Sequence, residues 1–297
     1  VYQSQQRSYR DLPLKFCEYG VVHRHEKSGV LHGLFRVREF TQDDAHLFVM
    51  PSQIKENVYE ILDFVDKMMK AFNFSYEMEI STKPQKAVGD DSVWEIATNA
   101  LKDALDEKGL KYGIDEGGGA FYGPKIDIKI TDALKRKWQC GTIQIDFNLP
   151  VRFELEYTDE NNQKQQPVMI HRAILGSFER FIGILLEHTA GELPFWIAHT
   201  QVAIVPISQN HHAYAKQIAD ELLDLGADSV VLNRNETLNK RIRNAEKEHV
   251  PLILVLGDNE LESKSVAVRD RMNKTQYNLT LEEFYKMIQS KLNEVAF

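Results

Sequence analysis

Beyond residue 197, short apolar runs alternate with amphipathic segments, and this alternation constrains the fold more than any other feature of the chain. The runs QVAIVPI, SVVL and PLILVLG are almost continuously apolar, which is typical of strands covered on both faces. Residues 211–225 and 236–248, which lie between them, have helical spacing. Strands that alternate with helices predict a mixed or mainly parallel sheet flanked by helices. We therefore expect residues 198–297 to form an α/β domain.

The preceding residues carry a different pattern, rich in strands with antiparallel character. Residues 17–50 are expected to form paired strands, and KIDIKI and TIQIDF add two more. Helical spacing predicts a helix behind Ser52 as N-cap, and a capping box of Ser92 with Glu95 predicts the start of a second helix. The stretch HRAILGSFERFIGILLEHTAG is expected to be one long apolar helix. Residues 1–197 should thus form an α+β domain on an antiparallel sheet.

Length, charge and cysteine content narrow the class of protein. A chain of 297 residues is long enough for two domains, and no run approaches the roughly 18 apolar residues that a membrane span needs. Two cysteines are too few for a disulfide scaffold, so we expect a cytoplasmic location and no membrane partner. The net charge of −8 argues against a general nucleic-acid binder but leaves room for one local basic face. Because the chain starts without Met, we expect it to be part of a longer protein.

The stretch HRHEKSGVLHGLFRVREFTQDDAHLF holds more charged side chains than a hairpin needs. If it forms two strands, Arg24 and Glu26 project from one face, and Arg36, Arg38 and Phe40 form a row on the return strand. Guanidinium forks bind phosphate, a carboxylate accepts from an amine, and a Phe ring stacks on a base, so this face suits a planar anionic ligand. The alternative is a solvated strand face with cross-strand ion pairs.

The commoner nucleotide-binding loops are absent from the sequence. Neither G-x-x-x-x-G-K-[ST] nor a G-x-G-x-x-G between a strand and a helix occurs, and EGGGAFYGP has the wrong frame for either. A nucleotide would therefore bind on an antiparallel sheet and not in the crevice of a parallel one.

Five stretches in the same order resemble the threonyl-tRNA synthetases, a family of class II aminoacyl-tRNA synthetases. They are HRHE, the return strand LHGLFRVREFTQDDAH, GGGAFYGPKIDI, QCGTIQIDF and VMIHRAILGSFERFIGILLE. The resemblance extends through the C-terminal domain. It implies a class II catalytic domain followed by an anticodon-binding domain. It also implies a threonine–tRNA ligase, which activates L-threonine with ATP and Mg²⁺ and transfers it to tRNA(Thr) in protein biosynthesis.

The resemblance assigns ATP to the hairpin and to GSFER. Arg24 would hold the α-phosphate, Glu26 would accept from the adenine amine, and Arg36 would bind phosphates. Phe40 would stack under adenine, and Arg180 would cover its other face. The resemblance thus implies that Arg24, Arg36 and Arg180 are the catalytic residues. The ATP-binding positions it implies are Arg24, Glu26, Arg36, Phe40, Gln139 and Arg180.

The resemblance also implies a zinc ion that receives the amino group and hydroxyl of threonine. His46 and His171 match two zinc ligands of the family. The third ligand, a cysteine, lies upstream in the family. We expect this chain to lack both that upstream segment and the first class II motif. Cys17 is not where the family places that ligand. We therefore expect weak or absent zinc and weak or no activity of this chain. The threonine-binding positions would be Gln42, Asp44, Tyr122 and Gln144, with Lys125 a weaker candidate.

The C-terminal domain concentrates basic residues in NRNETLNKRIRNAEKEH. Such a run is usually a solvated helix face, but the resemblance indicates an anticodon-binding face in which Asn235, Glu260 and Arg269 read bases. A homodimer is expected for the full-length enzyme. Two alternatives stay open: a non-catalytic synthetase-like module that binds tRNA or regulates, and a zinc hydrolase.

Overall fold

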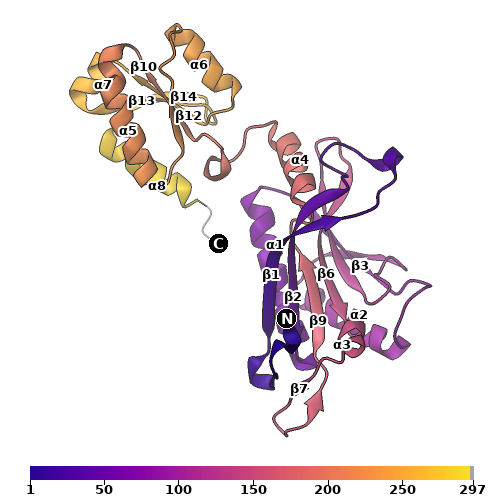
Figure 1. The fold of residues 1–297 in the computed structure, drawn as a ribbon. Coiled ribbons are helices and arrows are strands. Elements are labelled where there is room, and N and C mark those ends of the chain that lie inside the picture. The colour runs from indigo at the N-terminus through magenta and orange to yellow at the C-terminus, as the bar shows by residue number, and fades with distance from the viewer. Residues whose placement is uncertain (295–297) are drawn as a thin grey trace. The chain divides into compact units, whose positions relative to one another are not determined.

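The computed structural model describes residues 1–294, and it divides into two compact units, Val1–His188 and Thr189–Phe297 (Figure 1). The division falls at 188/189, whereas the composition of the sequence changes near residue 197. Phe195 explains the difference, because its side chain is buried in the apolar core of the second unit. None of the helices within 1–294 combines the length and apolar composition needed to cross a membrane.

The first unit is built on a seven-stranded sheet. Adjacent strands are antiparallel except for the last pair, β3 and β4, which is parallel, so the predicted antiparallel sheet is confirmed. In their order across the sheet the strands are β1 (Leu14–His23), β2 (Glu39–Val49), β9 (Val168–Ala173), β6 (Lys137–Asp146), β5 (Lys125–Thr131), β3 (Tyr76–Ser81) and β4 (Tyr112–Asp115). A small separate hairpin joins β7 (Tyr157–Thr158) and β8 (Lys164–Gln165).

Helices cover one face of this sheet and leave the other polar. α1 (Ile54–Ala71) and α2 (Asp91–Glu107) pack against strands β3, β5, β6 and β9. Along β5, Ile126, Ile128 and Ile130 are fully buried, and the alternation of a strand sends Lys125 and Asp127 to the opposite face. That opposite face carries the candidate site.

The stretch predicted as one long helix is instead a strand followed by a helix, so this prediction was wrong. Residues 168–173 form β9, and α4 spans Phe178–Thr189. Between them Gly176 has φ +70°, and a Cβ there would lie 2.3 Å from the carbonyl oxygen of Cys140. The chain must therefore turn at this glycine. An apolar run alone does not distinguish a buried strand from a helix.

The paired strands are confirmed, but the connection between them is longer than expected. β1 and β2 pair along their length, and residues 24–38 form a loop with a short 3₁₀ helix, η3 (Ser28–Val30). Arg24, Glu26 and Arg36 consequently lie on this loop and not on strand faces.

The predicted helix caps were wrong, although both helices are present. Ser52 lies inside the 3₁₀ helix η4 (Pro51–Gln53), and Gln53 precedes α1. Ser92 lies within the first turn of α2, behind Asp90. The N-cap position thus lies one residue after the predicted serine at α1 and two residues before it at α2, where Asp90 is a favourable N-cap residue type.

The second unit is the predicted α/β domain with a mixed sheet. Its strands, in order across the sheet, are β11 (Ser229–Val231), β10 (Val202–Pro206), β12 (Leu252–Leu256), β13 (Ser265–Asp270) and β14 (Thr275–Thr280). β10 is parallel to β11 and β12, and the last two strands are antiparallel. The helices are α5 (His212–Asp224), α6 (Leu238–Lys247), α7 (Asp258–Ser263) and α8 (Leu281–Leu292).

Both faces of the central strands β10 and β12 are buried, which explains why these two strands are continuously apolar. Val202 and Ile204 pack with α5 and α8, whereas Ala203 and Val205 pack with α6. α7 and β14 were not predicted, because the short DNELES and the polar TQYNLT lack the apolar periodicity that marks the other elements.

Candidate active site

A polar cavity of about 280 Å³ opens on the uncovered face of the first unit. The loop after β1, the strands β2 and β6, and the start of α4 all contribute to it. Its lining residues are Arg24, Glu26, Phe35, Arg36, Val37, Phe40, Gln42, Gln139, Cys140, Thr142, Gln144, Gly176, Ser177 and Arg180. All six predicted ATP-binding residues therefore lie around one cavity, although they are up to 156 positions apart in sequence (180 − 24).

Three guanidinium groups converge on this cavity. Arg24 lies over the ring of Phe40, 5.0 Å from its centroid, and Arg36 faces the Glu26 carboxylate at 3.8 Å. Burial lowers the pKa of Arg180, and the positive charges of Arg36 and Arg24 lower it further. The three cations line the same cavity, and such a cluster favours a multivalent anion.

Arg180 is held by backbone carbonyls. Its Nε donates to the carbonyl oxygen of Phe35 at 2.8 Å, and its Nη1 donates to that of Gln139 at 3.0 Å. The guanidinium also lies 5.5 Å from the centroid of the Trp138 ring. A planar cation fixed in this way can serve as one wall for a planar ligand.

Two carboxylates tie β2 to the start of α4, where Arg180 lies. Asp43 accepts from the backbone N–H groups of residues 174–176 at 2.8 to 3.1 Å. Glu179 accepts from the backbone N–H of Thr41 at 3.0 and 3.1 Å. Burial raises the pKa of Asp43, against the lowering effect of these N–H donors and of Arg172. The two carboxylates fix the arginine of α4 relative to the strand that carries Phe40.

A row of polar side chains crosses three neighbouring strands beside the cavity. His46 on β2 is directly opposite His171 on β9, which is directly opposite Gln144 on β6. The imidazole centroids are 4.8 Å apart, with the rings nearly perpendicular. Tyr122 donates to Gln144 Oε1, and burial raises the pKa of Tyr122 to about 12, which keeps this donor protonated.

Asp44 and His46 line a second and less polar cavity of about 530 Å³. The strand alternation places Gln42, Asp44 and His46 on the same face of β2, so both cavities lie on that face of the strand. Its other lining residues are Val1, Tyr2, Gln3, Phe16, Cys17, Glu18, Phe48, Phe153, Leu155 and Met169. Two of the predicted threonine-binding positions, Gln42 and Gln144, line the first cavity, and Asp44 lines the second. Tyr122 lines neither but donates to Gln144.

The two histidines fit a zinc site only in part. Burial lowers the pKa of His46, against the raising effect of Asp44, so the imidazole is neutral near pH 7, as a metal ligand must be. Asp146 Oδ2 lies 3.0 Å from His171 Nε2, the kind of partner that orients a ligating imidazole. However, no group of three His, Cys, Asp or Glu side chains in 1–294 is arranged to hold a metal ion.

Sequence reasoning missed several residues that shape the site. Three carboxylates that were not predicted lie outside the cavity lining but accept hydrogen bonds from residues that line it. They are Asp127, Glu179 and Asp43. Asp127 had a detectable signal, since it is a carboxylate inside the strand KIDIKI, where a solitary buried acid needs partners. Nothing in the local sequence distinguishes Asp43 from its neighbour Asp44.

The second unit separates the residues predicted to read the anticodon. Arg269 lies opposite Ile253 near the start of β12 and lines a groove of about 350 Å³, with Glu246 3.9 Å away. Glu260 follows the other end of β12 and accepts from the Gly257 N–H at 2.8 Å. Asn235 is exposed on the loop before α6. The three therefore do not share one groove.

Comparisons with known proteins agree with this geometry. Residues 1–189 match the family model described as tRNA synthetase class II core domain (G, H, P, S and T), and residues 201–291 match the anticodon binding domain. The threonine–tRNA ligases of Campylobacter lari and Campylobacter jejuni subsp. jejuni serotype O:6 are 77% and 74% identical over all 297 residues. These matches cover 49% of each relative, so the chain spans about half their length.

Solved structures give the same result. A structure described as the RNA binding domain of threonyl-tRNA synthetase from Cryptosporidium parvum Iowa II superposes with a TM-score of 0.93 at 44% identity, covering 98% of this chain and 73% of that one. A putative threonyl-tRNA synthetase from Aeropyrum pernix superposes with a TM-score of 0.79 at 30% identity, covering 96% and 70%. The chain belongs to the class II tRNA synthetases and, within them, to the threonyl-tRNA synthetase family.

Proposed function

We propose that this chain contains the adenylate-forming site of a threonine–tRNA ligase, together with a domain that binds tRNA(Thr). One observation carries the proposal: the guanidinium groups of Arg24, Arg36 and Arg180 share a cavity with the Glu26 carboxylate and the Phe40 ring. These are the groups that triphosphate, an exocyclic amine and a purine ring require. Arg24 lies over Phe40 here, so adenine would stack there only after Arg24 moves toward the α-phosphate.

The first reaction needs positioning and charge neutralisation, and it needs no protein nucleophile. The carboxylate oxygen of L-threonine attacks the α-phosphorus of ATP, and the bond to the pyrophosphate oxygen breaks. Arg24 and Arg36 would neutralise the charge that develops on the phosphates, with Mg²⁺ assisting as the family implies. Arg180, fixed by the carbonyls of Phe35 and Gln139, would form the wall of the site opposite Phe40.

The second reaction transfers the amino acid. A terminal ribose hydroxyl of tRNA(Thr) attacks the carbonyl carbon of threonyl-adenylate, its proton is lost, and AMP departs with the electrons of the broken bond. Departing AMP carries its charge on the α-phosphate that Arg24 would contact in the first step, so the same cavity would serve both reactions.

Recognition of threonine would use the polar row beside the cavity. Asp44 can accept from the side-chain hydroxyl, and Gln42, Tyr122 and Gln144 can bind the amino acid and the adenylate. When bound, Zn²⁺ would supply a Lewis acid for the amino and hydroxyl groups, with His46 and His171 as two of its ligands. Valine has the shape of threonine but no hydroxyl, and an apolar pocket alone separates such pairs by only about 10².

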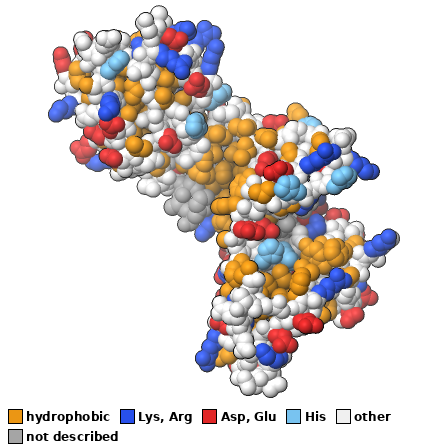
Figure 2. Space-filling view, in the orientation of Figure 1, with side chains coloured by type: hydrophobic (Ala, Val, Ile, Leu, Met, Phe, Trp, Pro, Cys, Tyr) orange, Lys and Arg blue, Asp and Glu red, His pale blue; other side chains and the backbone are white. Residues whose placement is uncertain are grey.

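The second unit would supply the RNA contacts. Lys and Arg side chains there are interspersed with acidic ones on the visible surface (Figure 2), so recognition would be local and would not use a broad basic surface. We propose that Asn235, Glu260 and Arg269 contact different bases of the anticodon, consistent with their separation across the sheet. A homodimer and a cytoplasmic location stay predictions.

Pyrophosphate exchange and tRNA charging by the full-length enzyme, with threonine, serine and proline as substrates, test this proposal. We expect threonine to be preferred, and Arg24→Ala and Arg180→Ala to lower kcat/KM by about a hundredfold or more. Arg152→Ala, at an exposed position on α3 (Asn148–Arg152), is the control and should leave it unchanged. Preference for proline would contradict the assignment. Binding of tRNA without exchange for any amino acid would favour the non-catalytic module.

A further inference from the structure

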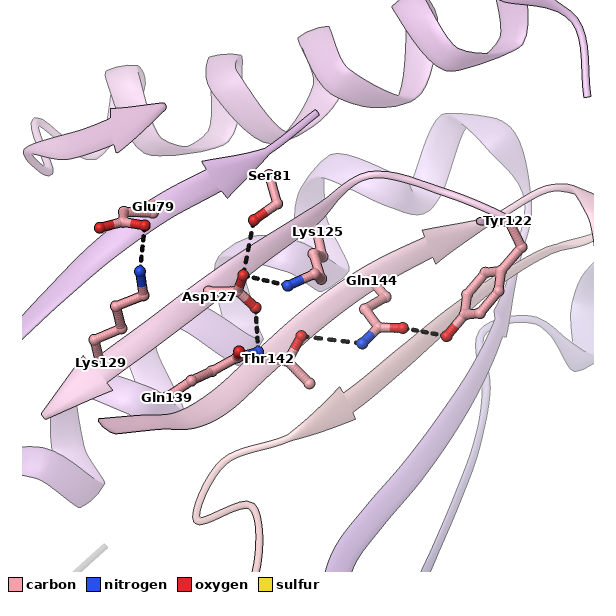
Figure 3. A network of polar contacts seen from close by, with 9 residues as sticks. All are labelled: Glu79, Ser81, Tyr122, Lys125, Asp127, Lys129, Gln139, Thr142 and Gln144. Carbon is pink, nitrogen blue, oxygen red and sulfur yellow. Dashed lines mark hydrogen bonds and ion pairs between the residues drawn. The ribbon is translucent and has the colours of Figure 1, made fainter. Parts of the chain in front are cut away.

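A buried carboxylate lies directly behind the cavity without lining it. Asp127, on β5, is only 2% exposed, and Figure 3 shows it at the centre of a polar network. Its Oδ2 accepts from Ser81 Oγ at 2.7 Å and pairs with the ammonium of Lys125, and its Oδ1 accepts from Gln139 Nε2. A buried carboxylate is stable only with such partners, and the three donors on its two oxygens hold Asp127 in one orientation.

This network determines which end of the Gln139 amide faces the cavity. A carboxylate can only accept, so the NH₂ group of Gln139 must be the end that faces Asp127. Turning the amide over would place two oxygens in contact. Gln139 Oε1 receives no hydrogen bond from the residues that the structure describes, and Gln139 lines the cavity. The cavity therefore presents a fixed acceptor at this point.

The same carboxylate restrains Lys125. Its ammonium contacts Asp127 Oδ2, and Lys125 lies directly opposite Gln144, which lines the cavity. Lys129 and Glu79 form the next pair along the sheet and have the same chemistry (Figure 3). Neither residue lines the cavity. Glu79 lies directly opposite Asp127 in the sheet and so offers a matched comparison.

A fixed carbonyl oxygen suits a hydrogen-bond donor on the ligand. ATP offers an adenine amine, which the proposed function assigns to Glu26, and two ribose hydroxyls. Phosphate oxygens are acceptors and would be repelled by Gln139 Oε1. We infer that Asp127 is a positioning residue of the nucleotide site, which orients Gln139 so that its carbonyl oxygen accepts from a ribose hydroxyl. This inference rests on the proposed function, because it takes ATP as the ligand.

Binding of ATP, 2′-deoxy-ATP and 3′-deoxy-ATP tests this role. The wild-type chain should bind one deoxy analogue about tenfold more weakly than ATP, the loss expected for one hydrogen bond. In Asp127→Asn the new amide can donate to Gln139, whose own amide then turns over, so ATP binding should weaken and the discrimination should disappear. Glu79→Gln should keep both. Loss of affinity for all three nucleotides by the same factor would show that Asp127 is merely structural and overturn the inference.

Two further readouts keep the inference falsifiable. Gln139→Ala leaves Asp127 in place and should abolish the same discrimination, and a discrimination that survives this change would overturn the inference. Without any nucleotide, the side-chain amide signals of Gln139 in NMR spectra, identified by their loss in Gln139→Ala, should lie apart from those of exposed glutamines and move in Asp127→Asn only. Ordinary signals would exclude the fixed orientation. Failure of the wild-type chain to bind ATP would instead refute the proposed function, which the amide signals do not depend on.

Discussion

The clamp between β2 and the start of α4 should be the most sensitive structural support of the site. Asp43→Ala removes the acceptor for three backbone N–H groups, those of residues 174–176, and the ionic partner of Arg172 at 3.5 Å. Hydrogen bonds to charged groups contribute about 1.5–3 kcal/mol each, but these three share one loop and water can reach it once the carboxylate is gone. We therefore expect a loss of about 3–4 kcal/mol.

Urea denaturation followed by circular dichroism measures this loss. With a slope of about 2–3 kcal/mol per molar, the transition of the first unit should move down by about 1–2 M. ATP should also bind at least tenfold more weakly, because the loop that Asp43 holds leads into the helix of Arg180. Asp159→Ala removes an exposed carboxylate that also accepts from two backbone N–H groups, and it should change neither quantity. An unchanged midpoint in Asp43→Ala would refute the clamp.

Three more predictions concern other buried groups. Burial works to raise the pKa of Asp132, but hydrogen bonds from Trp138 and Arg136 hold it below its ordinary value. Its stabilising effect is therefore complete above about pH 4 and lost at lower pH, and the stability gap between wild type and Asp132→Asn in urea should be smaller at pH 3 than at pH 7. Burial raises the pKa of the Cys140 thiol to about 12. A thiol reagent at pH 8 should therefore label only the exposed Cys17 until denaturant is added. Fast labelling of both cysteines would contradict the burial of Cys140. Arg241→Ala should destabilise the second unit by about 2–4 kcal/mol, seen as a lower urea midpoint, because the buried carbonyl of Pro206 and the half-buried carbonyl of Leu232 lose their donor. An unchanged midpoint would show that water replaces this donor.

Apolar periodicity predicted most elements of this fold, but it failed where a buried strand and a helix give the same apolar run. The apolar run before GSFER satisfied the pattern of a helix, yet only the requirement for a glycine beside the Cys140 carbonyl shows where the strand ends. That requirement comes from a contact between segments 36 residues apart (176 − 140), which no local pattern encodes. The loop of residues 24–38 between β1 and β2 was expected to be a shorter turn for a similar reason, because some of its residues alternate as a strand would.

The candidate site shows the same division between local and tertiary information. Gln42, Asp44 and His46 share a face because of strand alternation, which the sequence contains. The pairing of His46 with His171 depends on the register of β2 against β9, and the sequence does not contain it except through resemblance to a family. Strand alternation sends the neighbours Asp43 and Asp44 to opposite faces, but only the fold shows which face holds the clamp and which holds the cavity.

A structure of the chain with a non-hydrolysable ATP analogue tests the central claim most directly. We predict that adenine lies between Phe40 and Arg180, that Arg24 leaves the Phe40 ring to contact the α-phosphate, and that Arg36 binds the phosphates. A nucleotide bound outside this cavity, or phosphates that contact none of the three guanidinium groups, would contradict the account.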